Sequence, residues 1–596
     1  MDRRTIVFVI LMTATFYLVN HFLFPSKTPP VNAVAAMETI APVPAALQAK
    51  DERFYVIENE YQQLVVSSIN GSLAEINLPL ESPDNPKSVV KKIWVDDAMQ
   101  KDHSQVDYFP AGPYQTYLGS FDKGELGSYY PLLRRDVAPA YYGLATATGI
   151  PDSANTTYSV IRLEKHLIEM EGKTAGVRIR KTYVLPDEAC STPYTFEYTV
   201  NVDENPSELY LSTGIPEVEI VSGSSSPTLK YRSINAKQKA SIEQISLPKG
   251  STSLTNIRPE WVSNSNGFFA VLIDPQTEMG AGFTASQVPG TAAPTRLAQI
   301  DTDQNRFPIE KYPGYDLKVP FGKQEGTYKF RVFAGPLSSN VLDANDATFN
   351  EGYKGMQSFH GWLSFISEPF AKFLFFLMKI FYATVHSWGF SIILLTIALR
   401  AMMYPLNAWS IKSTMKMQKL SPKLAQLQAR HKKDPKKAQV EMMALYKSHG
   451  VNPLGGCFPL LIQMPFLIGM FDLLKSTFEL RGVPFIHGWI NNLTAPDIVF
   501  SWSTPIWFIG NSFHLLPILL GVVMFWQQRM SSVVPKDPKS MTDQQKQQRM
   551  MGNIMVIVFT VLFYHFPSGL NIYWLSSMLL AILQQWWMTK KRRVRA

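Results

Sequence analysis

Apolar residues are spread very unevenly along this chain of 596 residues. Long apolar runs crowd the C-terminal third, one more lies at the start, and the region between them alternates polar with apolar positions. A run of about 20 apolar residues is long enough for a helix to cross a bilayer, whereas alternation is typical of a half-buried strand. The pattern predicts a polytopic α-helical membrane protein with a large β domain.

The first apolar run, within residues 1–24, follows Arg3 and Arg4. It exceeds the apolar stretch of about 7–15 residues that signal peptides carry, which favours a retained transmembrane anchor with a cytoplasmic N-terminus. A signal peptide cut near residues 33–35 is the alternative. Residues 25–50 are rich in Pro and Ala and predict an extended linker.

Residues 51–345 read as β structure. Asn70-Gly71 separates two strand-like runs and is a strong hairpin signal. Further strands are expected at 177–185, 194–202, 267–273 and 327–333. The alternation and the frequent Pro and Gly predict a large antiparallel β-sandwich, which we expect on the periplasmic side.

Residues 346–386 follow the β domain and include a stretch that is apolar enough to span a membrane. Glu368, Lys372 and Lys379 interrupt it, and almost no loop separates it from the next apolar run. We therefore expect an amphipathic helix that lies on the outer membrane surface.

Residues 387–596 predict a core of five membrane spans, giving six with the N-terminal anchor. The spans are expected near 388–405, 455–478, 505–526, 551–566 and 570–588. The net charge of +9 is concentrated in the two longer loops between the spans and in the C-terminal tail. Six spans with both termini and both basic loops in the cytoplasm satisfy the positive-inside rule.

Arg400 lies inside the apolar run SIILLTIALRAMMYPL, and Thr396 precedes it by one helical turn. An arginine at the centre of a span costs about 2.5–3.5 kcal/mol on insertion scales, so it usually faces a wet cavity or a partner. Arg400 is also close enough to the end of its run to reach the interface by snorkelling. The third span carries Pro459 and Pro465, which should bend it, with Gln463 between them.

A basic stretch over 412–450 predicts a helical hairpin that stands in the cytoplasm. Its cationic residues include Lys423, Arg430, Lys432, Lys433, Lys436 and Lys437. The apolar seam between its helices is expected at Leu420, Leu424, Leu427, Val440, Met443 and Ala444. The charge either serves only to set topology or forms a platform for anionic headgroups or ribosomal RNA.

Several motifs resemble those of the YidC family of membrane protein insertases. They are GFSIILLTIALRAMMYPLN, VNPLGGCFPLLIQMPF and FPSGLNIYW, and the resemblance is strongest over residues 387–590. The first span and the β domain are similar to the Gram-negative bacterial form. The resemblance implies a hydrophilic groove, open to cytosol and lipid, that contains Arg400, Thr396 and the Tyr573-Trp574 pair. Many relatives carry an aromatic hydroxyl where this chain has Trp574.

The resemblance implies an insertase and chaperone of the bacterial inner membrane, acting alone or with the Sec translocon on nascent membrane proteins. We expect Gln463 to add a donor to the groove, and Pro459, Pro465, Met464 and Phe466 to meet apolar clients laterally. Partners are then the lipid bilayer and, through the basic hairpin and tail, the ribosome, with no DNA. A secondary transporter of an anionic solute and a passive assembly chaperone are the alternatives. No residue pattern suggests an enzyme, a cofactor or a metal site, and Cys190 and Cys457 imply no disulfide framework.

Overall fold

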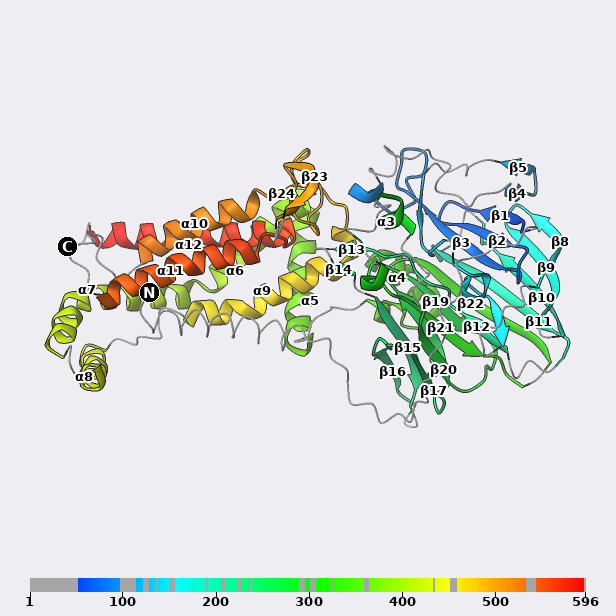
Figure 1. The fold of residues 1–596 in the computed structure, drawn as a ribbon, viewed down its shortest axis with the longest axis horizontal. Helices are drawn as coiled ribbons and strands as arrows, with labels where there is room; N and C mark the ends of the chain where they lie inside the picture. Colours follow the sequence, from blue (N-terminus) through cyan, green and yellow to red (C-terminus); the bar gives the residue numbers. More distant parts are fainter. Residues whose placement is uncertain are drawn as a thin grey trace. The chain divides into compact units, whose positions relative to one another are not determined.

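The computed structural model describes residues 52–593 with several gaps. These gaps are 97–113, 122–127, 136, 149–155, 175, 188–190, 205–208, 222–223, 226, 236–237, 289–294, 301–306, 308, 324, 358–363, 432–434, 451–457, 507–508 and 532–542. The chain divides into two compact units, one rich in β structure and one helical (Figure 1). The expected N-terminal anchor and linker lie outside the described residues.

Three sheets make up most of the β-rich unit. The six-stranded sheet has the order β5-β4-β1-β2-β3-β6, with β1 Phe54–Glu58, β2 Gln63–Ser67, β3 Ser72–Pro79, β4 Tyr114–Thr116, β5 Gly119–Phe121 and β6 Tyr129–Pro131. The nine-stranded sheet has the order β16-β15-β18-β19-β22-β11-β10-β9-β8, with β8 Ser159–Glu164, β9 Leu167–Thr174, β10 Val177–Val184, β11 Thr195–Val202, β15 Thr228–Ile234, β16 Ala240–Ile245, β18 Pro259–Ser265, β19 Phe269–Pro275 and β22 Gly326–Pro336. The five-stranded sheet has the order β17-β20-β21-β12-β7, with β7 Thr146–Thr148, β12 Leu209–Ser212, β17 Ser251–Leu254, β20 Phe283–Val288 and β21 Gly314–Pro320.

Small elements complete this unit. They are β13 Ile220–Val221, β14 Ser224–Ser225, α3 Thr295–Ile300, α4 Ser339–Phe349 and four 3-10 turns, η2 Pro139–Tyr141, η3 Ile309–Lys311, η4 Tyr353–Met356 and η6 Phe478–Leu480. The strands expected from the sequence correspond to β10, β11, β19 and β22. The predicted hairpin turn is present, because Asn70 and Gly71 both have positive φ, at 58° and 51°, between β2 and β3.

The sequence predicted purely antiparallel sheets, and this prediction is wrong for one pair of strands. β1 pairs in parallel with β4, through Phe54 with Tyr114 and Tyr55 with Gln115, whereas every other described strand pair is antiparallel. A parallel pair requires a long crossover connection. The residues between β1 and β4 provide this crossover. The alternation of polar and apolar residues within a strand does not reveal whether its neighbour is parallel or antiparallel.

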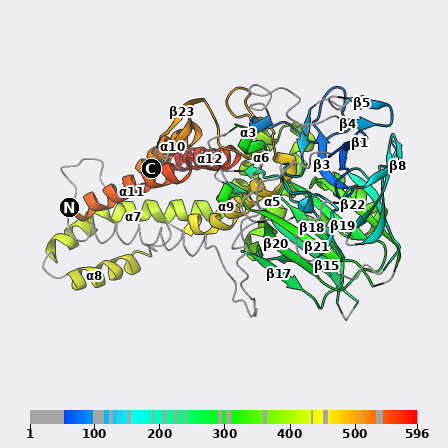
Figure 2. The same cartoon turned by 45° about the vertical axis from the view of Figure 1, so that its right-hand side comes forward.

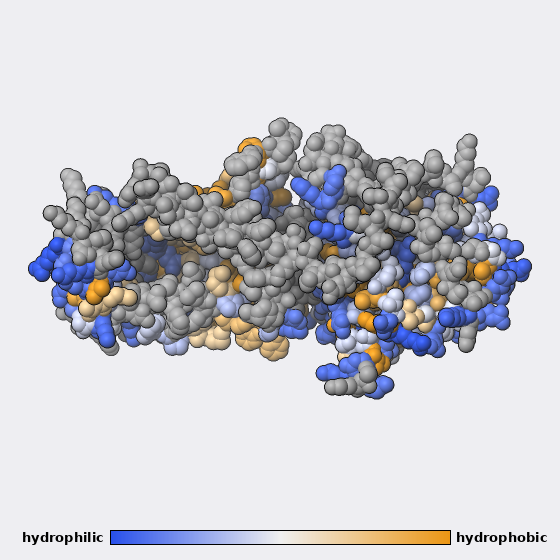
Figure 3. Space-filling view, turned by 60° about the horizontal axis from the view of Figure 1, so that its bottom comes forward, coloured by the Kyte–Doolittle hydropathy of each residue, from blue (hydrophilic) through white to orange (hydrophobic). Residues whose placement is uncertain are grey.

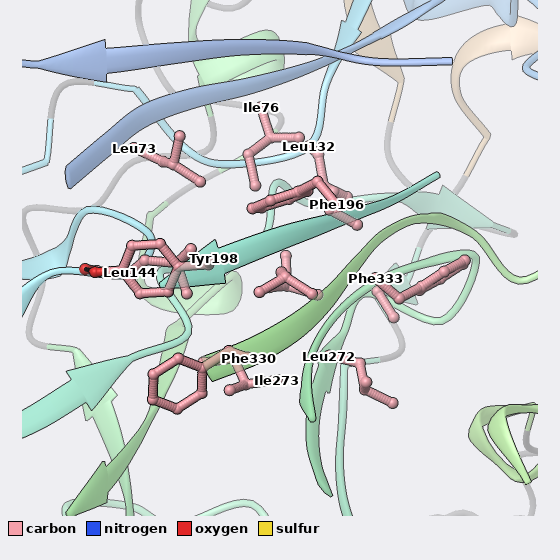
Figure 4. Close-up of a cluster of buried hydrophobic side chains, with 14 of the residues drawn as sticks. Leu73, Ile76, Leu132, Leu144, Phe196, Tyr198, Leu272, Ile273, Phe330 and Phe333 are labelled. Atoms are coloured by element: carbon pink, nitrogen blue, oxygen red, sulfur yellow. Dashed lines mark hydrogen bonds between the residues drawn. The ribbon is translucent and has the colours of Figure 1, made fainter. Parts of the chain in front are cut away.

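The core of the β-rich unit lies between packed sheets. In Figure 4, Leu73 and Ile76 of β3 face Phe196 and Tyr198 of β11, with further apolar side chains of β19 and β22 beside them. In β10 the buried residues alternate with more exposed ones, as expected for a strand with one covered face. By contrast, six consecutive residues of β19 are buried, so both of its faces are covered.

Residues Ser476–Arg481 belong to the β-rich unit, although the residues before and after them belong to the helical unit. The guanidinium of Arg481 donates to the carboxylate of Glu219 at 2.9 Å and to the carbonyl of Lys91 at 2.7 Å. Glu219 also meets Arg296 at 3.5 Å, and Arg296 is paired with buried Asp96. Charges buried this deeply are expensive unless they are paired, so Arg481 completes a network that the rest of the unit leaves short of a cation.

Eight helices are described in the helical unit (Figures 1 and 2). They are α5 Ser364–Val385, α6 Trp388–Met402, α7 Tyr404–Arg430, α8 Pro435–Ser448, α9 Phe458–Ser476, α10 Leu516–Ser531, α11 Asp543–Leu562 and α12 Ser568–Arg593, with a hairpin of β23 Phe500–Ile506 and β24 Gly510–Phe513. In Figure 1, α5 runs across the direction of α6, α9 and α12. It packs on α6, where the ring of Tyr382 stacks 4.2 Å from that of Trp388.

The expected fourth span differs from the structure. Residues 505–526 were predicted to be helical, but β23 and β24 occupy 500–513 and α10 begins only at Leu516. Pro505 and Gly510, the latter with φ of 74°, favour a hairpin over a helix at this point. Among the described helices, none by itself combines the length and apolarity of a membrane span, while α6 together with residues 407–417 of α7 meets the test as a pair bent by 66°.

Candidate functional site

Arg400 lies in the last turn of α6, an apolar helix that begins at a capped end. The Ser387 hydroxyl accepts from the Phe390 amide at 3.5 Å, and the backbone leaves the helix at Met403. Pro405 then lies in the first turn of α7, where its fixed φ is tolerated, so the chain bends between the two helices. A cation in the last turn also faces the negative end of the helix dipole, which favours an arginine at this place.

Ser577 of α12 holds the guanidinium of Arg400. The Nε and Nη2 atoms of Arg400 donate to the Ser577 hydroxyl oxygen at 3.1 and 2.8 Å. Ser577 is buried and Arg400 is partly buried. The Arg400 side chain therefore points toward α12, where its hydrogen-bond partner is uncharged.

A small pocket adjoins this pair, between α9 and α12. Its lining consists of Gln463, Met464 and Leu467 from α9 and Tyr573, Trp574, Ser577 and Met578 from α12. The pocket is open on one side; its volume is about 310 Å³ including the open side, and its inner part has room for about one water molecule. Four residues expected at the site, Gln463, Met464, Tyr573 and Trp574, thus lie together beside the hydroxyl that binds Arg400.

Gly569, in the first turn of α12, allows these helices to approach closely. A Cβ atom there would lie 2.8 Å from Leu474 of α9 and 3.3 Å from Ile392 of α6. A larger residue would therefore push the start of α12 away from both neighbours. The close packing of α6, α9 and α12 therefore requires glycine, with no side chain, at position 569.

Thr396 does not line the described pocket. It is buried, and its hydroxyl donates to the carbonyl of Ile392 within the same helix at 2.7 Å. This i−4 bond occupies its only proton, so Thr396 is left with acceptor capacity alone. Its place one turn before Arg400 is as expected, but its donor is used by α6 itself.

Trp574 lies in an aromatic cluster. Its ring meets Phe563, the first residue after α11, edge-on with centroids 4.9 Å apart, and it lies 6.1 Å from the ring of Phe559 on α11. The indole N–H is buried and has no hydrogen-bond partner among the described residues. Trp574 therefore contributes an apolar wall to the pocket together with one donor that a ligand or a water molecule is able to use.

The residues expected to contact clients laterally have different surroundings. Met464 is 40% exposed, while Phe466 packs edge-on against Phe370 of α5 at 5.0 Å. Pro465 lies inside α9. Pro459 lies in the first turn of α9, and its side chain is outside the described residues. Of this group, Met464 presents the open apolar surface.

The basic hairpin is present as α7 and α8, at one end of the helical unit (Figures 1 and 2). On the face drawn in Figure 3 this end is mainly hydrophilic, with a few hydrophobic residues among the hydrophilic ones. Lys423, Arg430 and Lys437 are exposed. Lys432 and Lys433 lie outside the described residues, as does the side chain of Lys436 in α8.

The predicted apolar seam of this hairpin is correct for Leu420 and Leu424 on α7 and wrong for Val440 and Met443 on α8. Leu420 and Leu424 are buried, and they pack on Met417, Met442, Leu445 and Tyr446. Val440 and Met443 are instead 69% and 57% exposed. Residues 438, 442 and 445 share one face of α8 at the helical period, and this is the face that packs inward.

Sequence reasoning missed Ser577. The signal was available, because Ser577 follows Tyr573 by four residues on the same helix and therefore shares its face. A serine in an apolar helix is nevertheless common and points to no particular partner. Only the packing of α6 on α12 shows that it meets Arg400.

Known proteins resemble this chain over most of its length. The family model "60Kd inner membrane protein" matches residues 380–595. A relative from Chlamydia caviae, named "Membrane protein insertase YidC", is 46% identical over 91% of this chain and 70% of its own length. The relative of the same name from Chlamydia trachomatis serovar D is 46% identical over 89% and 69%. A crystal structure titled "Active YidC insertase crystal structure with the first transmembrane domain resolved" covers 96% of this chain and 98% of its own at 17% identity, and its TM-score of 0.33 indicates only a loose superposition.

Proposed function

Since the chain belongs to the family of membrane protein insertases named YidC, we propose that Arg400 and the polar side chains beside it bind the polar segment of an inserting protein. Insertion of nascent membrane proteins into the inner membrane is the activity of this family, and it is the function of this chain. In outline, the client's polar tail meets Arg400 while its apolar helix moves sideways into lipid.

The observation that carries the proposal is the neutral partner of Arg400. Guanidinium groups bind carboxylates in forked pairs, and a buried arginine is usually neutralised in this way. Here the partner is the Ser577 hydroxyl, and Arg400 forms no ion pair with a carboxylate in the part of the chain that the structure describes. Two of its five N–H donors point at Ser577, so the positive charge and the remaining donors stay available to a ligand.

The physical problem of insertion explains why such a group is useful. A peptide segment that crosses hydrocarbon exposes backbone and side-chain polar groups, each costing several kcal/mol when unpaired. A fixed cation, the amide of Gln463, the Tyr573 phenol and the Trp574 indole would supply partners partway across. Hydrophobic transfer of the client helix and, for acidic tails, the membrane potential would supply the driving force.

The orientation that we propose places the α7–α8 hairpin and both termini in the cytoplasm and the β-rich unit in the periplasm. It rests on the excess of Lys and Arg in the hairpin and the C-terminal tail. In this orientation Arg400, at the end of α6 that leads into α7, lies in the cytoplasmic half of the bilayer. A client arriving from the cytosol meets it first, and its apolar part leaves past exposed Met464 of α9.

We also propose that the hairpin and tail contact the ribosome, and that the protein works both alone and beside the Sec translocon. Exposed Lys423, Arg430 and Lys437 support the ribosome contact, because clustered cations bind RNA phosphates. Such contacts weaken steeply with salt. The Sec partnership is proposed from the resemblance to the family.

Reconstitution tests the proposal directly. Liposomes that contain only this protein should insert a single-span client with a short acidic N-terminal tail. The Arg400→Ala variant should insert it at a strongly reduced rate, while a client with a neutral tail should be affected less. Equal insertion of the acidic-tailed client by Arg400→Ala and the unmodified protein would refute the role of Arg400. Uptake of small anions without any insertion would instead indicate a transporter.

A further inference from the structure

The β23–β24 hairpin precedes α10 and has two unlike faces. Phe500 pairs with Phe513 and Ser501 with Ser512 across the two strands. The rings of Phe500 and Phe513 stack with centroids 5.0 Å apart, and Trp502 lies 5.9 Å from Phe500. The neighbouring positions face the other way, because side chains alternate along a strand, and their hydroxyls lie 3.2 Å apart. One face of the hairpin is therefore aromatic and the other carries hydroxyls.

Apolar groups remain exposed on this hairpin even though part of its surface is packed. Phe500 is 55% exposed, and near the turn Ile506 and Ile509 are 51% and 36% exposed. The whole stretch 498–513 contains no Asp, Glu, Lys or Arg. A two-stranded hairpin in water normally carries charges at its edges to remain soluble and unpaired. The uncharged, partly apolar composition of the β23–β24 hairpin is instead typical of a segment that contacts a lipid or protein surface.

Several hydrogen bonds fix the hairpin to the helices of its unit. The carboxylate of Asp497 accepts from the Leu515 and Leu516 amides at 2.8 and 3.1 Å and thereby caps α10. The Tyr564 hydroxyl, from the residues that follow α11, donates to the Ser512 carbonyl at 3.2 Å. These hydrogen bonds attach the hairpin firmly to α10. The position of α10 in a membrane therefore determines how deep the hairpin lies in it.

The exposed apolar surface continues from the hairpin onto α10. Leu519, Val522 and Phe525 of this helix are 37%, 60% and 40% exposed. If α10 lies in the bilayer, as we propose for this helix of the insertase core, the hairpin at its N-terminal end lies at the border between hydrocarbon and water. Tryptophan and other aromatic residues with polar neighbours are enriched at that border.

From these observations we infer that the β23–β24 hairpin is an interfacial lipid anchor. Its aromatic face and the exposed side chains of Ile506 and Ile509 insert among the headgroups and upper acyl chains of the leaflet that holds the start of α10, while Ser501 and Ser512 face the water. Lipid fits better than a protein partner, since the hairpin has no charged residue with which to select a partner and its rim consists of hydroxyls. The inference rests on the proposed placement of α10 in the membrane.

Site-specific quenching tests the anchor in the full chain. Single cysteines are introduced as Ile506→Cys, Phe500→Cys, Ser501→Cys and Val522→Cys after replacement of the native thiols by Cys190→Ser and Cys457→Ser. Each is labelled with an environment-sensitive fluorophore, and the protein is placed in phosphatidylethanolamine–phosphatidylglycerol vesicles. Quenching is measured with lipids that carry a spin label near the headgroup and, separately, with aqueous iodide. Ser501 is the matched control, one residue from Phe500 on the opposite face.

The anchor predicts that probes at 506 and 500 are quenched several-fold more by the spin-labelled lipid than by iodide, with the reverse order at 501. Equal iodide quenching at 500, 501 and 506, with lipid quenching at Val522→Cys, would overturn the anchor and leave the membrane placement of α10 intact. Shielding of the probes at 500 and 506 from both quenchers would mean that protein covers the aromatic face of the hairpin. That result would also overturn the lipid anchor. Absence of lipid quenching at 522 would overturn the anchor and the proposed function together.

Discussion

The guanidinium of Arg400 donates both Nε–H and Nη2–H to one oxygen, the hydroxyl of Ser577, at 3.1 and 2.8 Å. This contact joins the end of α6 to the middle of α12 and leaves the arginine without a counter-charge from the described residues. The serine hydroxyl holds the Arg400 side chain in place without neutralising its charge, whereas a carboxylate would have neutralised it. Attraction of an acidic client tail by Arg400 depends on that difference.

Removing the hydroxyl should loosen Arg400 without changing its charge. A hydrogen bond to a charged group contributes about 1.5–3 kcal/mol, so Ser577→Ala should slow insertion of an acidic-tailed client several-fold. The neighbouring Ser576→Ala is the matched control, because Ser576 makes no contact with Arg400 among the described residues and its loss should change the rate little. Identical rates for the two variants in reconstituted vesicles would show that the bond does not position the arginine.

Charge at position 400 should matter more than shape. Arg400→Lys keeps a cation but loses the planar fork, so it should retain part of the activity, whereas Arg400→Ala should retain little. The measurement is growth of a strain depleted of its own insertase and supplied with each variant, together with insertion of a reporter in the same cells. Full complementation by the alanine variant would contradict a need for the charge.

The β-rich unit should depend on Arg481, although this residue lies far from the unit in sequence. Arg481→Ala removes the 2.9 Å partner of Glu219 and leaves a buried carboxylate with its longer contact to Arg296. Breaking a buried ion pair costs about 3–5 kcal/mol, so the variant should unfold at a clearly lower temperature and be digested faster by trypsin. Arg258→Ala provides the control, because Arg258 and its partner Glu278 are 70% and 73% exposed, and such pairs contribute about 0–1 kcal/mol. Equal destabilisation by both changes would argue against docking of Ser476–Arg481.

Lys181 should make the stability of the β-rich unit rise with pH. Its amine is fully buried and donates to the carbonyls of Asn70 and Leu144, at 2.7 and 3.3 Å. Burial lowers the pKa of Lys181 to about 7, against about 10.4 in an unfolded chain. Between these values the unfolded chain holds a proton that the folded unit lacks, so the free energy of unfolding gains about 1.4 kcal/mol per pH unit.

Below about pH 7 both states are protonated and this contribution is flat. Thermal unfolding from about pH 7 to 9 should therefore show a slope that Lys181→Met removes. Lys354→Met should keep it, because Lys354 is 54% exposed and paired with Asp343. A slope unchanged in Lys181→Met would assign the pH dependence to other groups.

Local patterns predicted much of this molecule. The alternation at 177–185 and 194–202 gave β10 and β11 nearly to the residue, and Asn70-Gly71 gave the turn between β2 and β3, because strand faces and turn conformations are set by neighbouring residues. The 505–526 stretch was predicted to be a membrane span because most of its residues are apolar, but its first part forms β23 and β24. Apolar content alone does not separate a helix from a hairpin.

Long-range contacts were beyond the reach of such patterns. Arg481 meets Glu219 across 262 residues, and Arg400 meets Ser577 across 177. The candidate site was predicted in part, because Gln463, Tyr573 and Trp574 lie in motifs with a known resemblance and do line one pocket. Ser577 has no such motif, and the donor of Thr396 is used within its own helix.

The central claim is that the polar part of a client meets the pocket between α9 and α12 beside Arg400. Photo-crosslinking from Gln463, which lines the pocket, to a ribosome-stalled client tests it most directly, with Leu583 on the exposed surface of α12 (59% exposed) as the comparison site. The account predicts that crosslinks from 463 reach the acidic tail of the client and disappear with Arg400→Ala, whereas any crosslinks from 583 reach only its apolar segment. Crosslinks to the tail that are equally strong from both sites, and insensitive to Arg400→Ala, would contradict it.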